Sequence, residues 1–181
     1  MFQGWDEYYF MIGSSAAALI GLLFVVATLS AGRDRSTIET GVRLFTTPLV
    51  CHFGAILVLS GSALAPSMTA TIFGLLSGVI AVAGVVAGVW IAVGIARFPY
   101  ENHSADWFVI WWYGIIPGLV YVLLGGAAAA ILMRASWAAS AFAVALMGLL
   151  LVTIHNAWDL VTFLAPRAEG NASAARDAAE H

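Results

Sequence analysis

The fold is decided by residues 70–96, ATIFGLLSGVIAVAGVVAGVWIAVGIA, a stretch that contains no charged side chain. A helix needs about 20 apolar residues to cross a hydrocarbon core of about 30 Å. Within lipid, backbone N–H and C=O groups must find partners inside the protein, and a helix provides them within one segment. This stretch is therefore predicted to be a membrane-spanning helix.

Other stretches of the chain have the same character. Spans are also predicted over residues 9–31, 42–64, 107–133 and 138–164, joined by short links. Short links make sequential helices antiparallel neighbours, and the continuous apolar runs differ from the short alternating segments of β-barrels. The predicted fold class is therefore all-α, a polytopic membrane protein. Residues 1–164 form a bundle of five transmembrane helices, and residues 165–181 form a flexible cytoplasmic tail.

The composition indicates the same class. Of 181 residues, 62% are hydrophobic and 9% are charged, whereas a soluble domain carries roughly 25% charged residues. One cysteine excludes a disulfide scaffold. A net charge of −3 without a basic patch excludes a nucleic-acid partner. The lipid bilayer is the expected surrounding.

The positions of the arginines predict the orientation, because positively charged loops stay in the cytoplasm. With five spans, Arg134 falls on one side of the membrane and every other arginine on the opposite side. The arginines of the larger group are Arg33, Arg35, Arg43, Arg97, Arg167 and Arg176. We therefore predict that the N-terminus lies outside and the C-terminus lies in the cytoplasm.

Three ionisable side chains within the spans are candidates for function, since such groups are costly in lipid. They are His52 in the second span and His155 and Asp159 in the fifth. Their positions predict a similar depth for the two histidines, and the four-residue spacing places His155 and Asp159 on one helical face. One interpretation is a satisfied polar contact that locks helices together, with Arg43 reaching Asp159. Another is a proton or ion pathway lined by all three residues.

A further interpretation is that His52 and His155 face each other and ligate haem or a metal, because haem iron and transition metals both accept imidazole ligands. It requires a facing geometry that the sequence does not establish. No Cys-x-x-Cys-His attachment motif is present. The prediction is therefore no bound cofactor and no metal site, with bis-histidine haem as the alternative.

Small residues within the spans predict close helix packing, which they permit in lipid. The third span, the richest in glycine, is expected to be the most buried. Pro48 and Pro117 are expected to kink their helices, and Pro117 to free the carbonyl of Tyr113. The candidate packing residues are Gly74, Gly78, Gly84, Gly88, Gly114 and Gly118.

The chain resembles small uncharacterised bacterial multi-pass proteins in its first helix, through residues 5–10, WDEYYF, and residues 13–25, GSSAAALIGLLFV. Some of those proteins are labelled as modulators of a membrane protease. The resemblance implies a bacterial inner-membrane protein and carries over no catalytic residue.

The motifs of common enzymes are absent from the sequence. It has no phosphate loop, no His-Glu-x-x-His and no nucleophile elbow, so no catalytic residue is identified. We expect a noncatalytic accessory or regulatory component that interacts with another membrane protein or forms a homo-oligomer. The alternatives are a small channel or transporter using His52, His155 and Asp159, and a haem-binding electron-transfer protein.

Overall fold

A computed structural model describes residues 4–30, 35–97 and 107–164. Every regular element among these residues is helical, as predicted. The elements are α1 Asp6–Ser30, α2 Arg35–Leu64, α3 Ala70–Arg97, α4 Trp107–Ile110, η1 Trp111–Ile115, α5 Ile116–Leu132 and α6 Ala138–Leu164. The tail predicted over residues 165–181 lies outside the described residues.

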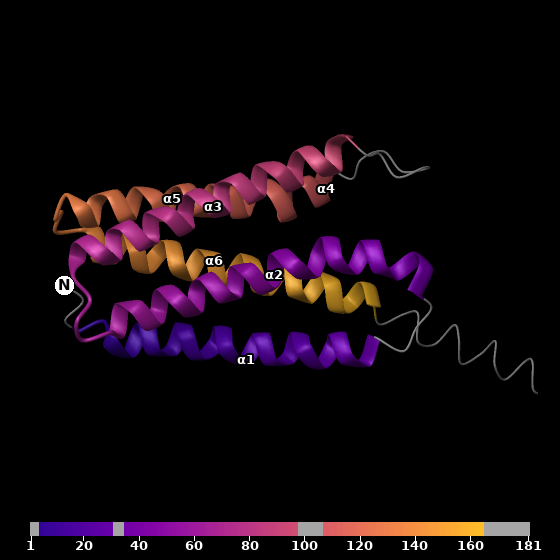
Figure 1. Ribbon diagram of the computed structural model, residues 1–181, viewed down its shortest axis with the longest axis horizontal. Coiled ribbons are helices and arrows are strands. Elements are labelled where there is room, and N and C mark those ends of the chain that lie inside the picture. The colour runs from indigo at the N-terminus through magenta and orange to yellow at the C-terminus, as the bar shows by residue number, and fades with distance from the viewer. Residues whose placement is uncertain (1–3, 31–34, 98–106, 165–181) are drawn as a thin grey trace, which may run out of the picture.

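Five helical segments are long and apolar enough to cross a membrane, which makes the chain a multi-pass membrane protein. The spans are Asp6–Thr28, Thr46–Leu64, Ala70–Gly94, Phe108–Leu132 and Ala138–Thr162. Figure 1 shows them running side by side along the long axis of the molecule. The fourth span, predicted as one helix, consists of α4, η1 and α5.

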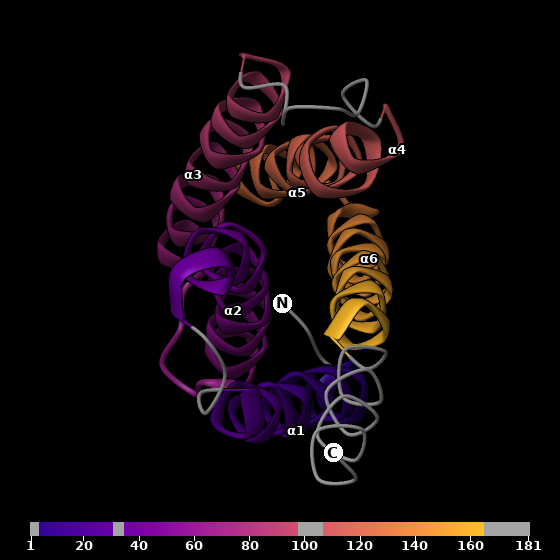
Figure 2. The ribbon, with the colours of Figure 1, turned by 90° about the vertical axis from the view of Figure 1, so that its right-hand side faces the viewer.

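The helices form a bundle in which α2 and α6 lie between two outer groups. Figure 2 looks along the helices and shows α3 with α5 on one side and α1 on the other. α3 packs against α5 and η1, α1 packs against α2, and α6 contacts α1, α2 and α5. The core includes Tyr9, Phe53, Phe73 and Phe142, all with exposed fractions of 1% or less.

The expectation that the third span is the most buried is wrong. In the most apolar window of each span, 44% of the residues of α6 are buried but only 33% of those of α3. α6 lies between several helices, whereas α3 lies at the edge of the bundle and packs with one side. Its other side exposes Val79, Val82 and Val86, which suits contact with lipid.

Local interactions explain where the helices begin and end. The Thr69 hydroxyl accepts a hydrogen bond from the N–H of Ile72 at 3.3 Å and so caps the start of α3. Between α5 and α6, Arg134 has a φ of 57°. Its N–H bonds the carbonyl of Ile131, and the next N–H bonds the carbonyl of Ala130, both at 3.0 Å. This pattern is a Schellman motif with arginine where glycine is usual.

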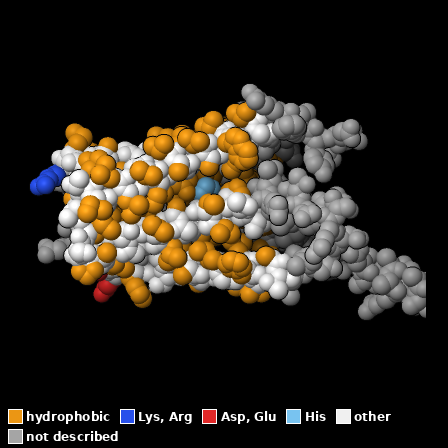
Figure 3. Space-filling model, in the orientation of Figure 1, with side chains coloured by type: hydrophobic (Ala, Val, Ile, Leu, Met, Phe, Trp, Pro, Cys, Tyr) orange, Lys and Arg blue, Asp and Glu red, His pale blue; other side chains and the backbone are white. Residues whose placement is uncertain are grey.

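Charged side chains avoid the middle of the visible face. Figure 3 shows hydrophobic side chains along the length of the bundle, with the colours of charged residues at its left-hand end. Asp6 and Glu7 begin α1, and Arg134 lies in the turn before α6. This distribution is what a bundle surrounded by lipid requires.

Candidate functional site: two polar contacts within the membrane

The first polar contact joins α2 to α5 through His52 and Tyr121. His52 Nδ1 lies 2.8 Å from the Tyr121 hydroxyl oxygen. His52 is 5% exposed and Tyr121 is 3% exposed. The tyrosine donates when Nδ1 is unprotonated and accepts when Nδ1 carries the ring proton. In either case two buried polar groups satisfy each other, which ties the two helices together.

The same tyrosine ring also reaches α3. A Cβ atom placed on Gly84 would overlap the Tyr121 ring atoms Cγ, Cδ1 and Cδ2. Only glycine therefore fits at this position while the ring stays where it is. Tyr121 links α5 to α2 by its hydroxyl and to α3 by its ring.

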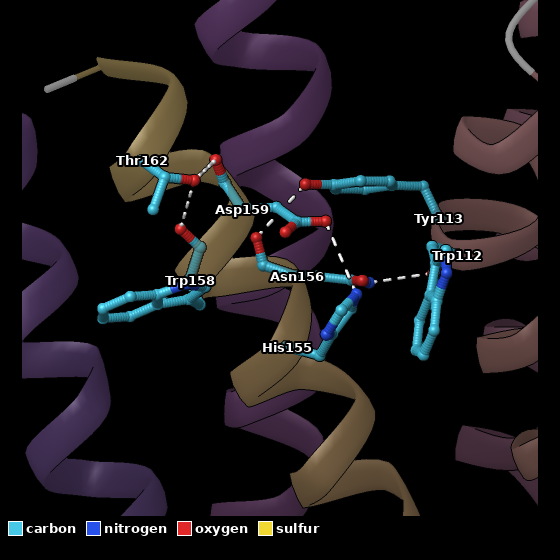
Figure 4. A network of polar contacts seen from close by, with 7 residues as sticks. All are labelled: Trp112, Tyr113, His155, Asn156, Trp158, Asp159 and Thr162. Carbon is cyan, nitrogen blue, oxygen red and sulfur yellow. Dashed lines mark hydrogen bonds and ion pairs between the residues drawn. The ribbon is translucent and has the colours of Figure 1, made fainter. Parts of the chain in front are cut away.

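The second polar contact is built on α6. His155 Nε2 lies 3.5 Å from Asp159 Oδ2, and the two side chains are 37% and 34% exposed. The imidazole stacks on the Trp112 indole, with ring centroids 3.7 Å apart and planes tilted by 32°. Figure 4 shows these side chains between α6 and the helix opposite. Trp112 therefore orients the His155 imidazole through this stack.

Asn156 fastens α6 to the irregular turn η1. Its side-chain Nδ2 donates to the carbonyl of Trp112 at 3.0 Å. In the other direction, the Tyr113 hydroxyl donates to the backbone carbonyl of Asn156 at 3.2 Å, as Figure 4 shows. Asn156 is 2% exposed, so both bonds are sheltered.

The turn η1 is π-helical, and its hydrogen-bond register explains why the Trp112 carbonyl is free to accept the bond from Asn156. The Ile116 N–H bonds the carbonyl of Trp111, five residues earlier. In this register the next N–H would bond the Trp112 carbonyl, but the next residue is Pro117, which has none. The prediction that Pro117 frees the carbonyl of Tyr113 is therefore wrong. The freed carbonyl is that of Trp112, and the Asn156 side chain donates a hydrogen bond to it.

The two histidines take part in separate contacts. His52 bonds Tyr121, whereas His155 contacts Trp112 and Asp159. In the described part of the chain, no hydrogen bond or ion pair joins the histidines. Within the same ranges, no three His, Cys, Asp or Glu side chains lie together as metal ligands. α6 does pack against α2, so the two contacts occupy neighbouring helices. The predicted contact between Arg43 and Asp159 involves a side chain that lies outside the described residues.

The candidate packing glycines differ in their surroundings. A Cβ on Gly74 would lie 2.7 Å from the Leu132 side chain, and one on Gly88 would lie 3.0 Å from the carbonyl oxygen of Gly114. A Cβ on Gly114 would lie 2.8 Å from Cβ of Ala92. With Gly84, these residues bring α3 close to η1 and α5. Gly78 and Gly118 would meet no side chain or distant backbone within 4 Å.

A cavity of about 220 Å³ lies at one end of the bundle, away from both polar contacts. The start of α1 and the link between α2 and α3 line it. Its polar groups include Asp6, Ser62 and Thr69, and Phe73 and Met68 supply apolar walls. None of the three predicted ionisable residues borders this cavity.

Reasoning from the sequence missed Tyr121 and assigned Trp112 and Tyr113 no polar role. The available signal for Tyr121 was a hydroxyl group in the middle of a long apolar run, because a buried hydroxyl needs a partner. For Trp112, the signal was Pro117 five residues later together with the Asn156 amide in another span.

Comparison of the chain with protein-family models, curated proteins and solved structures finds no match.

Proposed function

We propose that this multi-pass membrane protein is a noncatalytic accessory or regulatory component that binds a transmembrane helix of another membrane protein or of a second copy. We place it in the bacterial inner membrane with the N-terminus outside and the C-terminus in the cytoplasm. The arginine distribution supports this orientation through the preference of positive loops for the cytoplasm.

The observation that carries the proposal is an outward face of small residues on α1. Ser14, Ala17, Ala18 and Gly21 are all exposed, and their spacing places them on one side of a helix. A Cβ on Gly21 would meet nothing within 4 Å. By contrast, Gly13 faces inward, where a Cβ would lie 3.0 Å from Cβ of Ser60.

Small residues let a second helix approach closely in lipid, where apolar burial alone gives little preference between partners. α1 is also the least buried of the spans, with 22% of its most apolar window buried. The exposed side of α3 instead carries branched side chains such as Val82 and Val86. These features favour α1 as the helix that receives the partner.

Site-directed crosslinking in native membranes tests this function. In a Cys51→Ser background, Ala18→Cys should give a crosslinked adduct with a membrane-protein partner or a second copy. Val82→Cys on α3 is the matched exposed control and should stay uncrosslinked. Only monomer at both positions, or equal crosslinking at both, would argue against the proposal.

A second candidate is a small channel or transporter using His52, His155 and Asp159. It is favoured by the exposure of about one third of the His155 and Asp159 side chains within a span. Proteoliposomes containing the protein should then show proton or ion flux that falls when these residues are replaced. Flux that is unchanged by all three replacements would remove their assigned role.

A further inference from the structure

The His155–Asp159 pair is spaced more widely than a typical hydrogen bond. A hydrogen bond between a nitrogen donor and an oxygen acceptor peaks near about 2.9–3.0 Å, and charged pairs are shorter. The distance from Nε2 to Oδ2 is 3.5 Å, and Nε2 has no hydrogen-bond partner although it is shielded from the surface. The two groups therefore lie within ion-pair distance but form no hydrogen bond at Nε2.

A second buried polar atom lies on the neighbouring residue. Asn156 Oδ1 has no hydrogen-bond partner, and the residue is 98% buried because its exposed fraction is 2%. Its Nδ2 is fixed on the Trp112 carbonyl, and the His155 ring stacks on the indole of the same tryptophan. Both orphan atoms thus belong to side chains held by Trp112, as Figure 4 shows.

His155 Nε2 and Asn156 Oδ1 can each offer a lone pair and have no hydrogen-bond donor beside them. The Asp159 carboxylate, next to His155, also offers lone pairs. A carboxylate and an amide oxygen are acceptors, and a neutral imidazole with its proton on Nδ1 presents a lone pair at Nε2. A buried orphan atom calls for a water or an ion. A cation is the ligand that nitrogen and oxygen lone pairs would share.

The 3.5 Å separation also matches two ligands of one tetrahedral ion. Zinc binds imidazole nitrogen and carboxylate oxygen at about 2.0–2.2 Å, which places two tetrahedral ligands about 3.3–3.5 Å apart. Octahedral Mg²⁺ at about 2.0–2.1 Å would require a closer pair and prefers oxygen ligands. Imidazole with carboxylate instead suits a divalent transition metal.

We propose that His155 and Asp159 bind a divalent transition-metal ion of the Zn²⁺ class, with the Asn156 side-chain oxygen as a further donor and water completing the coordination. The Trp112 stack sets the direction of the imidazole before the ion arrives. At about 1.5 Å per residue, Asp159 lies roughly 5 Å and His155 roughly 10 Å inside the Thr162 end of the span. Of the two ligands, the carboxylate therefore lies nearer to this end of the span.

Titration of the purified full chain in detergent with Zn²⁺, followed by calorimetry, tests the site. We expect one ion per chain at this pair. Because loss of an outer partner alone weakens metal binding about 10–100-fold, His155→Ala and Asp159→Asn should each weaken it at least about 10-fold. His52→Gln is the matched control, since His52 belongs to the other contact, and should leave binding unchanged.

A spectroscopic measurement separates loss of ligands from loss of fold. Co²⁺ in place of Zn²⁺ should give visible absorption bands of a nitrogen- and oxygen-ligated tetrahedral ion, and Asp159→Asn should abolish them while the helical circular dichroism stays unchanged. Two results would overturn the proposal. One is folded wild-type protein that binds neither ion, and the other is binding that survives both replacements.

Discussion

Gly84→Ala should destabilise the bundle because one methyl group then competes with the Tyr121 ring for the same space. A Cβ at this position would overlap three ring atoms. The ring cannot simply turn aside, since its hydroxyl bonds buried His52 at 2.8 Å. The substitution must either move α3 away from α5 or break the contact between α5 and α2.

Three contributions set the magnitude of this effect. Overpacking costs about 1–3 kcal/mol. An interhelical hydrogen bond in a membrane protein contributes about 0.6 kcal/mol on average and about 1.7 kcal/mol at most. The higher helix propensity of alanine than of glycine offsets up to about 1 kcal/mol of this cost. The net loss in the free energy of unfolding should be about 1–3 kcal/mol.

Equilibrium unfolding in mixed micelles measures this loss. Gly78→Ala on the same helix is the matched control, because its Cβ meets nothing within 4 Å, and it should cause no destabilisation. In a Tyr121→Ala background, Gly84→Ala should lose most of its cost, since the ring is gone. The reasoning is refuted if Gly84→Ala is as stable as Gly78→Ala, or if its cost is the same without the ring.

Two further substitutions test the contacts around η1. Asn156→Leu should destabilise by about 1–2 kcal/mol, because the Trp112 carbonyl loses its donor; unfolding measurements should show a smaller cost in a Pro117→Ala background, where a backbone N–H returns. Gly88→Ala should also destabilise in the same assay, because its Cβ would lie 3.0 Å from the backbone oxygen of Gly114, which cannot rotate away as a side chain can. A neutral result for either variant would contradict the packing described for η1.

The sequence was sufficient for the spans but not for the local register. Length and hydropathy predict where a chain must be helical in lipid, and the expected start at residue 138 coincides with the start of α6. The π-helical turn before Pro117 could not be predicted, because it depends on Asn156 of another span supplying a hydrogen bond. Likewise, a glycine-rich sequence indicates close packing but not how many helices surround the segment. The burial of α3 within the bundle was therefore overestimated.

The polar site was predictable only in part. The four-residue spacing of His155 and Asp159 follows from helix geometry, and the structure places them 3.5 Å apart. Each histidine also contacts an aromatic residue of the fourth span, His52 through the Tyr121 hydroxyl and His155 through the Trp112 ring. Pairing between helices depends on their rotation about their own axes, which the sequence of one span does not reveal.

Labelling of single cysteines in spheroplasts tests the central claim, a five-span protein with its ends on opposite sides of the membrane. In a Cys51→Ser background, Ser67→Cys and Ser136→Cys should react with a membrane-impermeant maleimide, because both are exposed in links at one end of the bundle. Ser173→Cys should react only after the membrane is opened. Labelling of Ser173→Cys together with Ser136→Cys in intact spheroplasts would contradict the five-span topology.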